Sequence, residues 1–211
     1  MTASDIAKEN QALGIIENLK KRNINGYYAE TAEKCAKLVL SLIKEGSSVT
    51  WGGSESIKEC KIPEMLSESG KYAVLDRSKA DPGNMKAFYK EALFADCFLM
   101  STNAITLDGE MMNIDGFGNR VASLIFGPDR VIIVAGMNKV VSDIDAAYDR
   151  IRNMASPPNT VRLQKNTPCA RNGKCGNCMG EDCICNQIVV TRRSRDKDRI
   201  HVVLVGESLG Y

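Results

Sequence analysis

Short apolar runs alternate with helical segments along the first 157 residues, and this alternation constrains the fold more than any other feature. Helical spacing of apolar residues predicts helices over residues 5–22, 31–46, 84–96 and 142–155. Strands are predicted over residues 47–53, 71–76, 97–102 and 130–136. Strands that alternate with helices of this length indicate βαβ units. We therefore expect an α/β protein with a mainly parallel sheet and helices on both faces.

The segment after residue 155 is expected to complete the same domain. The sequence SPPN at 156–159 is predicted to end the last helix, because proline cannot continue a helix. Two apolar runs, QIVV at 187–190 and IHVVLVGES at 200–208, are expected to return to the sheet or to extend its edge. We predict one domain over residues 1–211, with a cysteine-rich, metal-binding loop at 166–187 inside it.

Five of the eight cysteines lie between Cys169 and Cys185, with the spacing C-x5-C-x2-C-x4-C-x-C. Disulfides are found mainly in oxidising compartments and in small domains that cannot build a core. This chain is 44% hydrophobic, which is enough for a substantial core, and its N-terminal segment has no apolar export signal. A cytoplasmic protein is therefore expected, and there a cysteine cluster favours a metal site.

The spacing of the cysteines favours iron over zinc. Structural zinc sites typically use two separated C-x2-C pairs, or cysteine together with histidine, whereas iron–sulfur clusters favour compact all-thiolate loops. Cys169, Cys175 and Cys178 are the natural first three ligands of a 4Fe–4S cluster, with zinc as the alternative. Either Cys183 or Cys185 could be the fourth, because the two lie on one side of an extended segment. With three ligands only, one iron would be open and could act as a Lewis acid.

The charge distribution argues against a nucleic-acid or membrane partner. The net charge is +2, from 28 basic and 26 acidic residues, and no stretch is apolar enough to span a membrane. The densest basic segment, TRRSRDKDR at 191–199, is interrupted by two aspartates and is interpreted as a polar hairpin tip between strands. The sequence is compatible with a homo-oligomer.

Three polar segments follow predicted strands, where ligands bind in open parallel sheets. Backbone N–H groups and polar side chains that could bind an anionic substrate are Gly52, Gly53, Ser54, Asn103, Thr106, Asn119, Arg120 and Asn138. Candidate catalytic groups are Asp108, Glu110, Asp115 and Lys139. Two Asp-Gly pairs within 101–120 also indicate tight turns, and the Gly-Gly-Ser of 52–54 is itself a common turn.

Four stretches of the sequence resemble the lactate-utilisation (LUD) domain family: residues 101–128, 134–152, 157–169 and 200–211. The resemblance covers nearly the whole chain. It implies a three-layer α/β/α sandwich similar to ribose-5-phosphate isomerase, glucosamine-6-phosphate deaminase and the CoA transferases. In the cysteine-bearing branch, it implies metal ligation at Cys169, Cys175, Cys178 and Cys185. Relatives carry arginine where this chain has Cys183, which favours Cys185 as the fourth ligand.

The resemblance also implies a link to the oxidation of lactate or related 2-hydroxy acids. The first hypothesis is an iron–sulfur protein whose 4Fe–4S cluster transfers electrons to or from redox partner proteins. No GxGxxG fingerprint is present, so hydride chemistry would belong to a partner. The second hypothesis is an enzyme acting on a small anionic carboxylate or phosphate, with an open iron as Lewis acid. In the third hypothesis, zinc or a cluster has only a structural role and holds the C-terminal strands in place.

Overall fold

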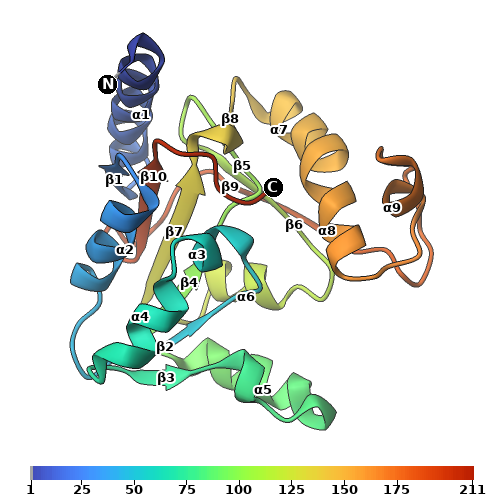
Figure 1. The fold of residues 1–211 in the computed structure, drawn as a ribbon, viewed down its shortest axis with the longest axis horizontal. Coiled ribbons are helices and arrows are strands. Elements are labelled where there is room, and N and C mark those ends of the chain that lie inside the picture. Colours follow the sequence, from blue (N-terminus) through green and yellow to red (C-terminus); the bar gives the residue numbers. More distant parts are fainter. Residues whose placement is uncertain (1) are drawn as a thin grey trace.

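Six parallel strands form the central sheet of the computed structural model, which describes residues 2–211 (Figure 1). Across this sheet the strands follow the order β1 (Asn25–Ala29), β10 (Ile200–Val205), β7 (Arg130–Gly136), β4 (Cys97–Met100), β2 (Ser48–Trp51) and β3 (Ala73–Leu75). Every neighbouring pair is parallel. The predicted parallel sheet is therefore confirmed, and the carboxyl ends of all six strands meet at one edge.

Helices cover both faces of this sheet. The core on one face contains residues of α2 (Ala32–Ser41), α3 (Glu55–Glu59) and α4 (Ile62–Ser69), and the core on the other contains residues of α1 (Ala3–Lys21) and α6 (Asn119–Ile125). Along β4, Leu99 faces the first core, whereas Phe98 and Met100 face the second. The connection from β3 to β4 contains α5 (Met85–Glu91). The expected three-layer α/β/α sandwich is confirmed.

A second, smaller sheet was not predicted from the sequence. Its strand order is β8 (Val140–Val141), β5 (Ala104–Thr106), β6 (Met111–Asp115) and β9 (Gln187–Thr191). The strands β5 and β6 form an antiparallel hairpin, and one face of this sheet packs against α7 (Ile144–Arg150). Because β5 follows β4 and β8 follows β7 along the chain, the small sheet lies beyond the carboxyl ends of the large one.

The two C-terminal apolar runs separate into different sheets. The strand β10 lies between β1 and β7 and is buried along its whole length, so this run returns to the central sheet, the first of the two expected outcomes. Its run of apolar residues is typical of a strand that is covered on both faces. The strand β9 joins the small sheet instead. Residues 191–199 therefore connect two sheets and do not form the predicted hairpin tip.

The segment SPPN does not end the helical region. The helix α7 continues as a π-helical turn, Ile151–Ala155, and then as α8 (Ser156–Arg162). Pro157 and Pro158 lie in the first turn of α8, where the backbone N–H groups have no intrahelical acceptor, so proline is tolerated there. The π turn absorbs the register change before them.

No helix within residues 2–211 combines the length and the apolar character that crossing a membrane requires. The longest helix, α1, has 19 residues, and its buried residues are Ala12, Ile15 and Leu19.

Candidate functional site

The carboxyl ends of β2 and β4 enclose the crevice where the chain reverses its winding direction. The connection after β2 runs through α3 on one face of the sheet, and the connection after β4 runs through α6 on the other face. In open α/β sheets, ligands bind at such a switch point. Residues 52–54 follow β2, residues 101–103 follow β4, and residues 137–139 follow β7, the next strand of the sheet.

Lys139 is buried at this crevice between two serines. Its Nζ lies 2.9 Å from Ser56 Oγ and 3.0 Å from Ser101 Oγ, and only 4% of the residue is exposed. Burial, together with the cationic Arg150 and Arg120, lowers the pKa of Lys139 to about 7. Near neutral pH the amine is therefore available both as a cation and as a base.

Arg120 is the hub that joins the loops of the crevice. Its guanidinium donates to four oxygens: Ser101 O (3.1 Å), Asn113 Oδ1 (2.6 Å), Asn103 Oδ1 (2.9 Å) and Ile114 O (2.8 Å). Asp115 Oδ2 lies 3.6 Å from Arg120 Nε and provides a counter-charge. Because the protein itself accepts these hydrogen bonds, the role of Arg120 in this structure is to hold the β4 loop against the β6 strand.

Arg150 of α7 is a second buried cation beside Lys139. Its Nη1 donates to Asn103 O at 2.6 Å and its Nε to Asn138 O at 3.1 Å. Within residues 2–211, no carboxylate forms an ion pair with Arg150 or with Lys139. Buried charges are costly without a partner, so this positive crevice favours the binding of an anion.

The glycine segment after β2 borders a narrow cleft. Its walls include Trp51, Gly52, Arg77 and Asn119, and its volume of about 10 Å³ is no larger than one water molecule needs. A Cβ atom on Gly53 would lie 3.1 Å from an Arg77 nitrogen, so this guanidinium covers the glycine. Ser54 caps α3 by accepting from Ile57 N, and its side chain is therefore committed to the helix.

Asp108, Glu110 and Thr106 lie in the β5–β6 hairpin, whereas Asn138 directly precedes Lys139. Asp108 and Glu110 are at the tip of the β5–β6 hairpin, where Glu110 pairs with Arg22 of α1 at 3.3 Å. Thr106 Oγ1 accepts from Glu110 N and closes the same hairpin. The side chain of Asn138 binds the C-terminal tail through Leu209 N. A catalytic role for the hairpin carboxylates stays a prediction, and no contact links them to the amine.

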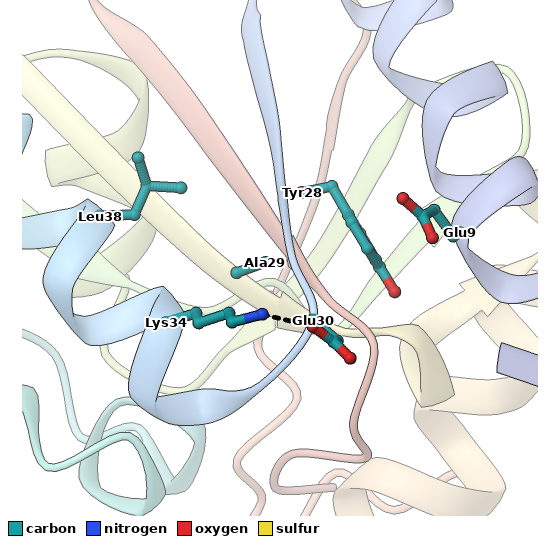
Figure 2. A pocket seen from close by; sticks show the side chains of 6 residues that line it. All are labelled: Glu9, Tyr28, Ala29, Glu30, Lys34 and Leu38. Atoms are coloured by element: carbon teal, nitrogen blue, oxygen red, sulfur yellow. Dashed lines mark hydrogen bonds and ion pairs between the residues drawn. The ribbon is translucent and has the colours of Figure 1, made fainter. Parts of the chain in front are cut away.

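A wider cavity of about 330 Å³ lies elsewhere, at the end of β1 between α1 and α2 (Figure 2). Its lining includes the carboxylates of Glu9 and Glu30, and Lys34 forms an ion pair with Glu30. Burial and these carboxylates raise the pKa of Tyr28 in its wall. The negative charge makes this cavity unsuited to an anionic substrate, which leaves the positive crevice as the better site.

The cysteine-rich loop begins with a short helix, α9 (Pro168–Asn172), capped by the side chain of Thr167. All five of its cysteines are free thiols. Burial and the neighbours Cys183, Cys175 and Cys169 together raise the pKa of Cys185 to about 11, although a hydrogen bond with Ser156 opposes the shift. Burial and the neighbouring Cys183 also raise the pKa of Cys178. The thiols of the loop therefore influence one another's ionisation.

Donors from the surrounding helices point at these sulfur atoms. Arg152, in the π turn, donates from Nε to Cys175 Sγ at 3.1 Å, and Asn177 N reaches the same sulfur at 3.4 Å. The hydroxyl of Thr167 lies 3.2 Å from Cys169 Sγ and can donate to it. The hydroxyl of Thr160 lies 3.4 Å from the same sulfur, but it donates to Pro157 O. Hydrogen bonds to thiolate sulfur are a regular feature of iron–sulfur sites. The donor set of the loop fits such a group.

Among residues 2–211, no three cysteine, histidine or carboxylate side chains converge closely enough to bind one metal ion. These residues therefore show no preformed site for a single ion such as zinc, whose ligands meet at one centre. In a 4Fe–4S cluster each thiolate binds a different iron, so its ligands form a wider ring.

The cysteine-rich loop and α8, which precedes it, each contact a segment at the crevice. Arg162 of α8 lies 3.5 Å from the carboxylate of Glu55 at the start of α3. At the other end, Asn186 N donates to Asp115 O at 3.0 Å, beside the carboxylate that pairs with Arg120. One residue therefore separates the end of the loop from the Arg120 hub.

Sequence reasoning missed several residues of both sites. Ser56, Ser101 and Arg150 contact Lys139 or the loops around it, and Arg152 contacts Cys175. Ser101 carried a usable signal, because it directly follows a fully buried strand. Arg150 and Arg152 lie in helical segments, and the spacing of residues along a helix does not show which loop a side chain contacts.

Comparisons with known proteins identify the fold and the family model that fit this chain. The model of the LUD domain matches residues 14–205. The crystal structure of a DUF162 family protein from Deinococcus radiodurans is similar, with a TM-score of 0.54, 13% sequence identity, and coverage of 94% of this chain and 98% of that chain. No curated protein matches the sequence. At this identity the structural likeness shows the fold alone.

Proposed function

The chain belongs to the LUD domain family, and on this premise we propose that it is an iron–sulfur protein linked to the oxidation of lactate or a related small 2-hydroxy acid. The family supports a role related to lactate utilisation. The observation that carries the finer proposal is the presence of five free thiols in one short loop, with an N–H donor directed at Cys175 Sγ and an O–H group beside Cys169 Sγ.

In this proposal Cys169, Cys175, Cys178 and Cys185 hold a 4Fe–4S cluster, which supplies one-electron transfer when bound. Arg152 and Asn177 N stabilise the negative charge on Cys175, and the hydroxyl of Thr167 does so at Cys169. The loop lies at the molecular surface, where a redox partner protein can approach its half-exposed cysteines. Thiols remain free in a reducing compartment, so the proposal places the protein in the cytoplasm.

Substitution of single cysteines tests this proposal. Cys178→Ser should lose iron. Cys97→Ser should retain it, because Cys97 is buried in β4 of the central sheet and does not belong to the cysteine-rich loop. Comparing Cys183→Ser with Cys185→Ser identifies the fourth ligand, since only the ligand variant should lose iron. Equal iron content in Cys178→Ser and Cys97→Ser would reject the proposed ligand set.

A second candidate function, an enzyme on a small anionic substrate, is favoured by the two buried cations of the crevice. Lys139 and Arg150 have no carboxylate partner within residues 2–211. In the same network, Asn113 Nδ2 is buried with no acceptor among those residues. Isothermal titration with L-lactate and with inorganic phosphate tests this candidate. Binding that Lys139→Met abolishes supports it, and the absence of binding by both probes argues against it.

A further inference from the structure

We propose that Ser101 is a nucleophile that accepts an acyl group from a small ester, with Lys139 as its base and Ser56 as the residue that orients Lys139. This activity goes beyond electron transfer, and no cysteine takes part in it. The three side chains come from separate parts of the chain: Ser101 lies 38 residues before Lys139, and Ser56 lies 83 residues before it. Serine–lysine pairs of this kind support acyl transfer on unrelated folds.

The hydrogen bonds of Ser56 determine which groups donate and which accept among Ser56, Lys139 and Ser101. The hydroxyl of Ser56 donates to Leu209 O at 3.2 Å, so its oxygen is left to accept from Lys139 Nζ at 2.9 Å. A neutral amine has one lone pair, and with an N–H directed at Ser56 this lone pair is free for the hydroxyl of Ser101. As an ammonium, Lys139 donates to Ser101 Oγ at 3.0 Å, and Ser101 donates to Thr102 O at 3.2 Å. When the amine is neutral, Nζ becomes the nearer acceptor for the Ser101 hydroxyl.

The two serines also differ in access and position. Ser101 retains 8% of its exposed surface, whereas Ser56 retains 1%. Ser101 directly follows β4, at the carboxyl end of a central strand, where α/β enzymes place nucleophiles. Its backbone carbonyl is held by Arg120 Nη1 at 3.1 Å. Ser101 is therefore the less deeply buried of the two hydroxyls and is assigned as the nucleophile, and Ser56 is a positioning residue.

The electrostatic surroundings keep the amine partly neutral near pH 7. The charged groups that act on Lys139 are Arg150 on α7, Arg120 on α6 and Glu59 on α3, and only Glu59 favours the protonated form. A lysine that is desolvated or placed beside other cations is an effective base.

The reaction step balances within this cluster. Ser101 Oγ forms a bond to the acyl carbon of the ester, and its proton moves to Lys139 Nζ. The bond between the acyl carbon and the alcohol oxygen then breaks, and the leaving alcohol takes the proton from Lys139. The product is an acyl-serine ester, which water hydrolyses by the reverse proton path.

Reaction of the full-length protein with p-nitrophenyl acetate tests this proposal. We expect a burst of about one equivalent of p-nitrophenolate and an acetyl group on Ser101 in peptide mass spectra. Ser101→Ala should abolish both, and Lys139→Met should slow the burst about 100-fold. The rate should rise with pH through about 7, the pKa of Lys139.

Two further variants separate a chemical role from a structural one. Ser123→Ala removes a buried hydroxyl that donates to Asn119 O, and it should leave the burst unchanged. Ser56→Ala should keep the acetyl group on Ser101 but move the pH midpoint lower, because the ammonium loses an acceptor. An acetyl group on Lys139 instead of Ser101, or a correctly folded wild-type protein without a burst, would overturn the proposal. If Ser101→Ala does not fold, the identity of the acetylated residue in the wild-type protein still tests the proposal.

Discussion

Lys139 Nζ lies 3.0 Å from Ser101 Oγ, although the two residues are 38 positions apart in the sequence. Their proximity follows from the topology, because β4 and β7 are parallel neighbours and each residue follows the carboxyl end of its strand. A charged group is thereby buried where two loops meet, and the stability of the fold depends on whether that group is protonated.

Stability should rise with pH relative to a Lys139→Met variant. The pKa of Lys139 falls from 10.5 to about 7 on folding, so between these values the unfolded chain binds more protons than the folded one. The penalty of the buried cation is fully present below pH 7 and fades as the pH rises toward 10.5. We expect the free energy of unfolding to increase by about 2 kcal/mol between pH 7 and pH 9 relative to the variant. Urea unfolding at both pH values measures this difference, and a constant difference would show that Lys139 has an ordinary pKa.

Arg120→Lys should destabilise the protein by about 3 kcal/mol. A lysine keeps the charge but cannot satisfy four acceptors in a fixed planar geometry, so buried oxygens of the β4 loop and β6 lose their donors. Chemical denaturation of the variant checks this value. Arg162→Lys is the matched control, because Arg162 makes a more exposed ion pair with Glu55, and it should cost less than about 1 kcal/mol. Equal losses in the two variants would contradict the role of Arg120 as a hub.

Gly136→Ala should also be destabilising, by about 1–3 kcal/mol. A Cβ atom at Gly136 would lie 2.4 Å from Asn138 Oδ1 and 2.6 Å from Leu209 N, so the tail and the Lys139 loop would be pushed apart. Gly14→Ala on α1 provides the opposite case. Nothing lies within 4 Å of a Cβ there, and alanine should stabilise the helix by about 0.5–1 kcal/mol. Thermal melts of both variants test the pair, and a change of the same sign in both would contradict this packing.

The strands that the sequence predicts best are those buried on both faces. The apolar run at 130–136 coincides with β7, and α1 differs from its predicted bounds by only one or two residues. The strands β5 and β8 have three and two residues, which is too short for a periodic pattern to appear. The continuation of the helix through Pro157 and Pro158 depends on a π turn that tertiary packing supports.

The candidate site was predictable only in part. The position of Lys139 after an apolar strand indicated a carboxyl-end site, and the structure places it there. Asp108 and Glu110 have the same polar surroundings in the sequence, yet the β5–β6 hairpin carries them to the end of α1. Composition alone does not distinguish a hairpin tip from a crevice. The partners of Lys139 come from distant segments, so only the topology identifies them.

Arg152→Gln should lower the midpoint potential of the cluster. Removing the guanidinium eliminates a hydrogen bond and a positive charge at Cys175 Sγ, and both favour the reduced, more negative state. Spectroscopic redox titration measures the shift. Arg171→Gln, which removes the same charge from an exposed position in the loop, should change the potential less. Equal shifts would show that only the net charge of the loop matters.

The iron and sulfide content of anaerobically purified protein tests the central proposal most directly. The account predicts a brown protein with a broad visible absorption shoulder and about four iron and four sulfide per chain. A colourless protein that contains stoichiometric zinc would contradict it.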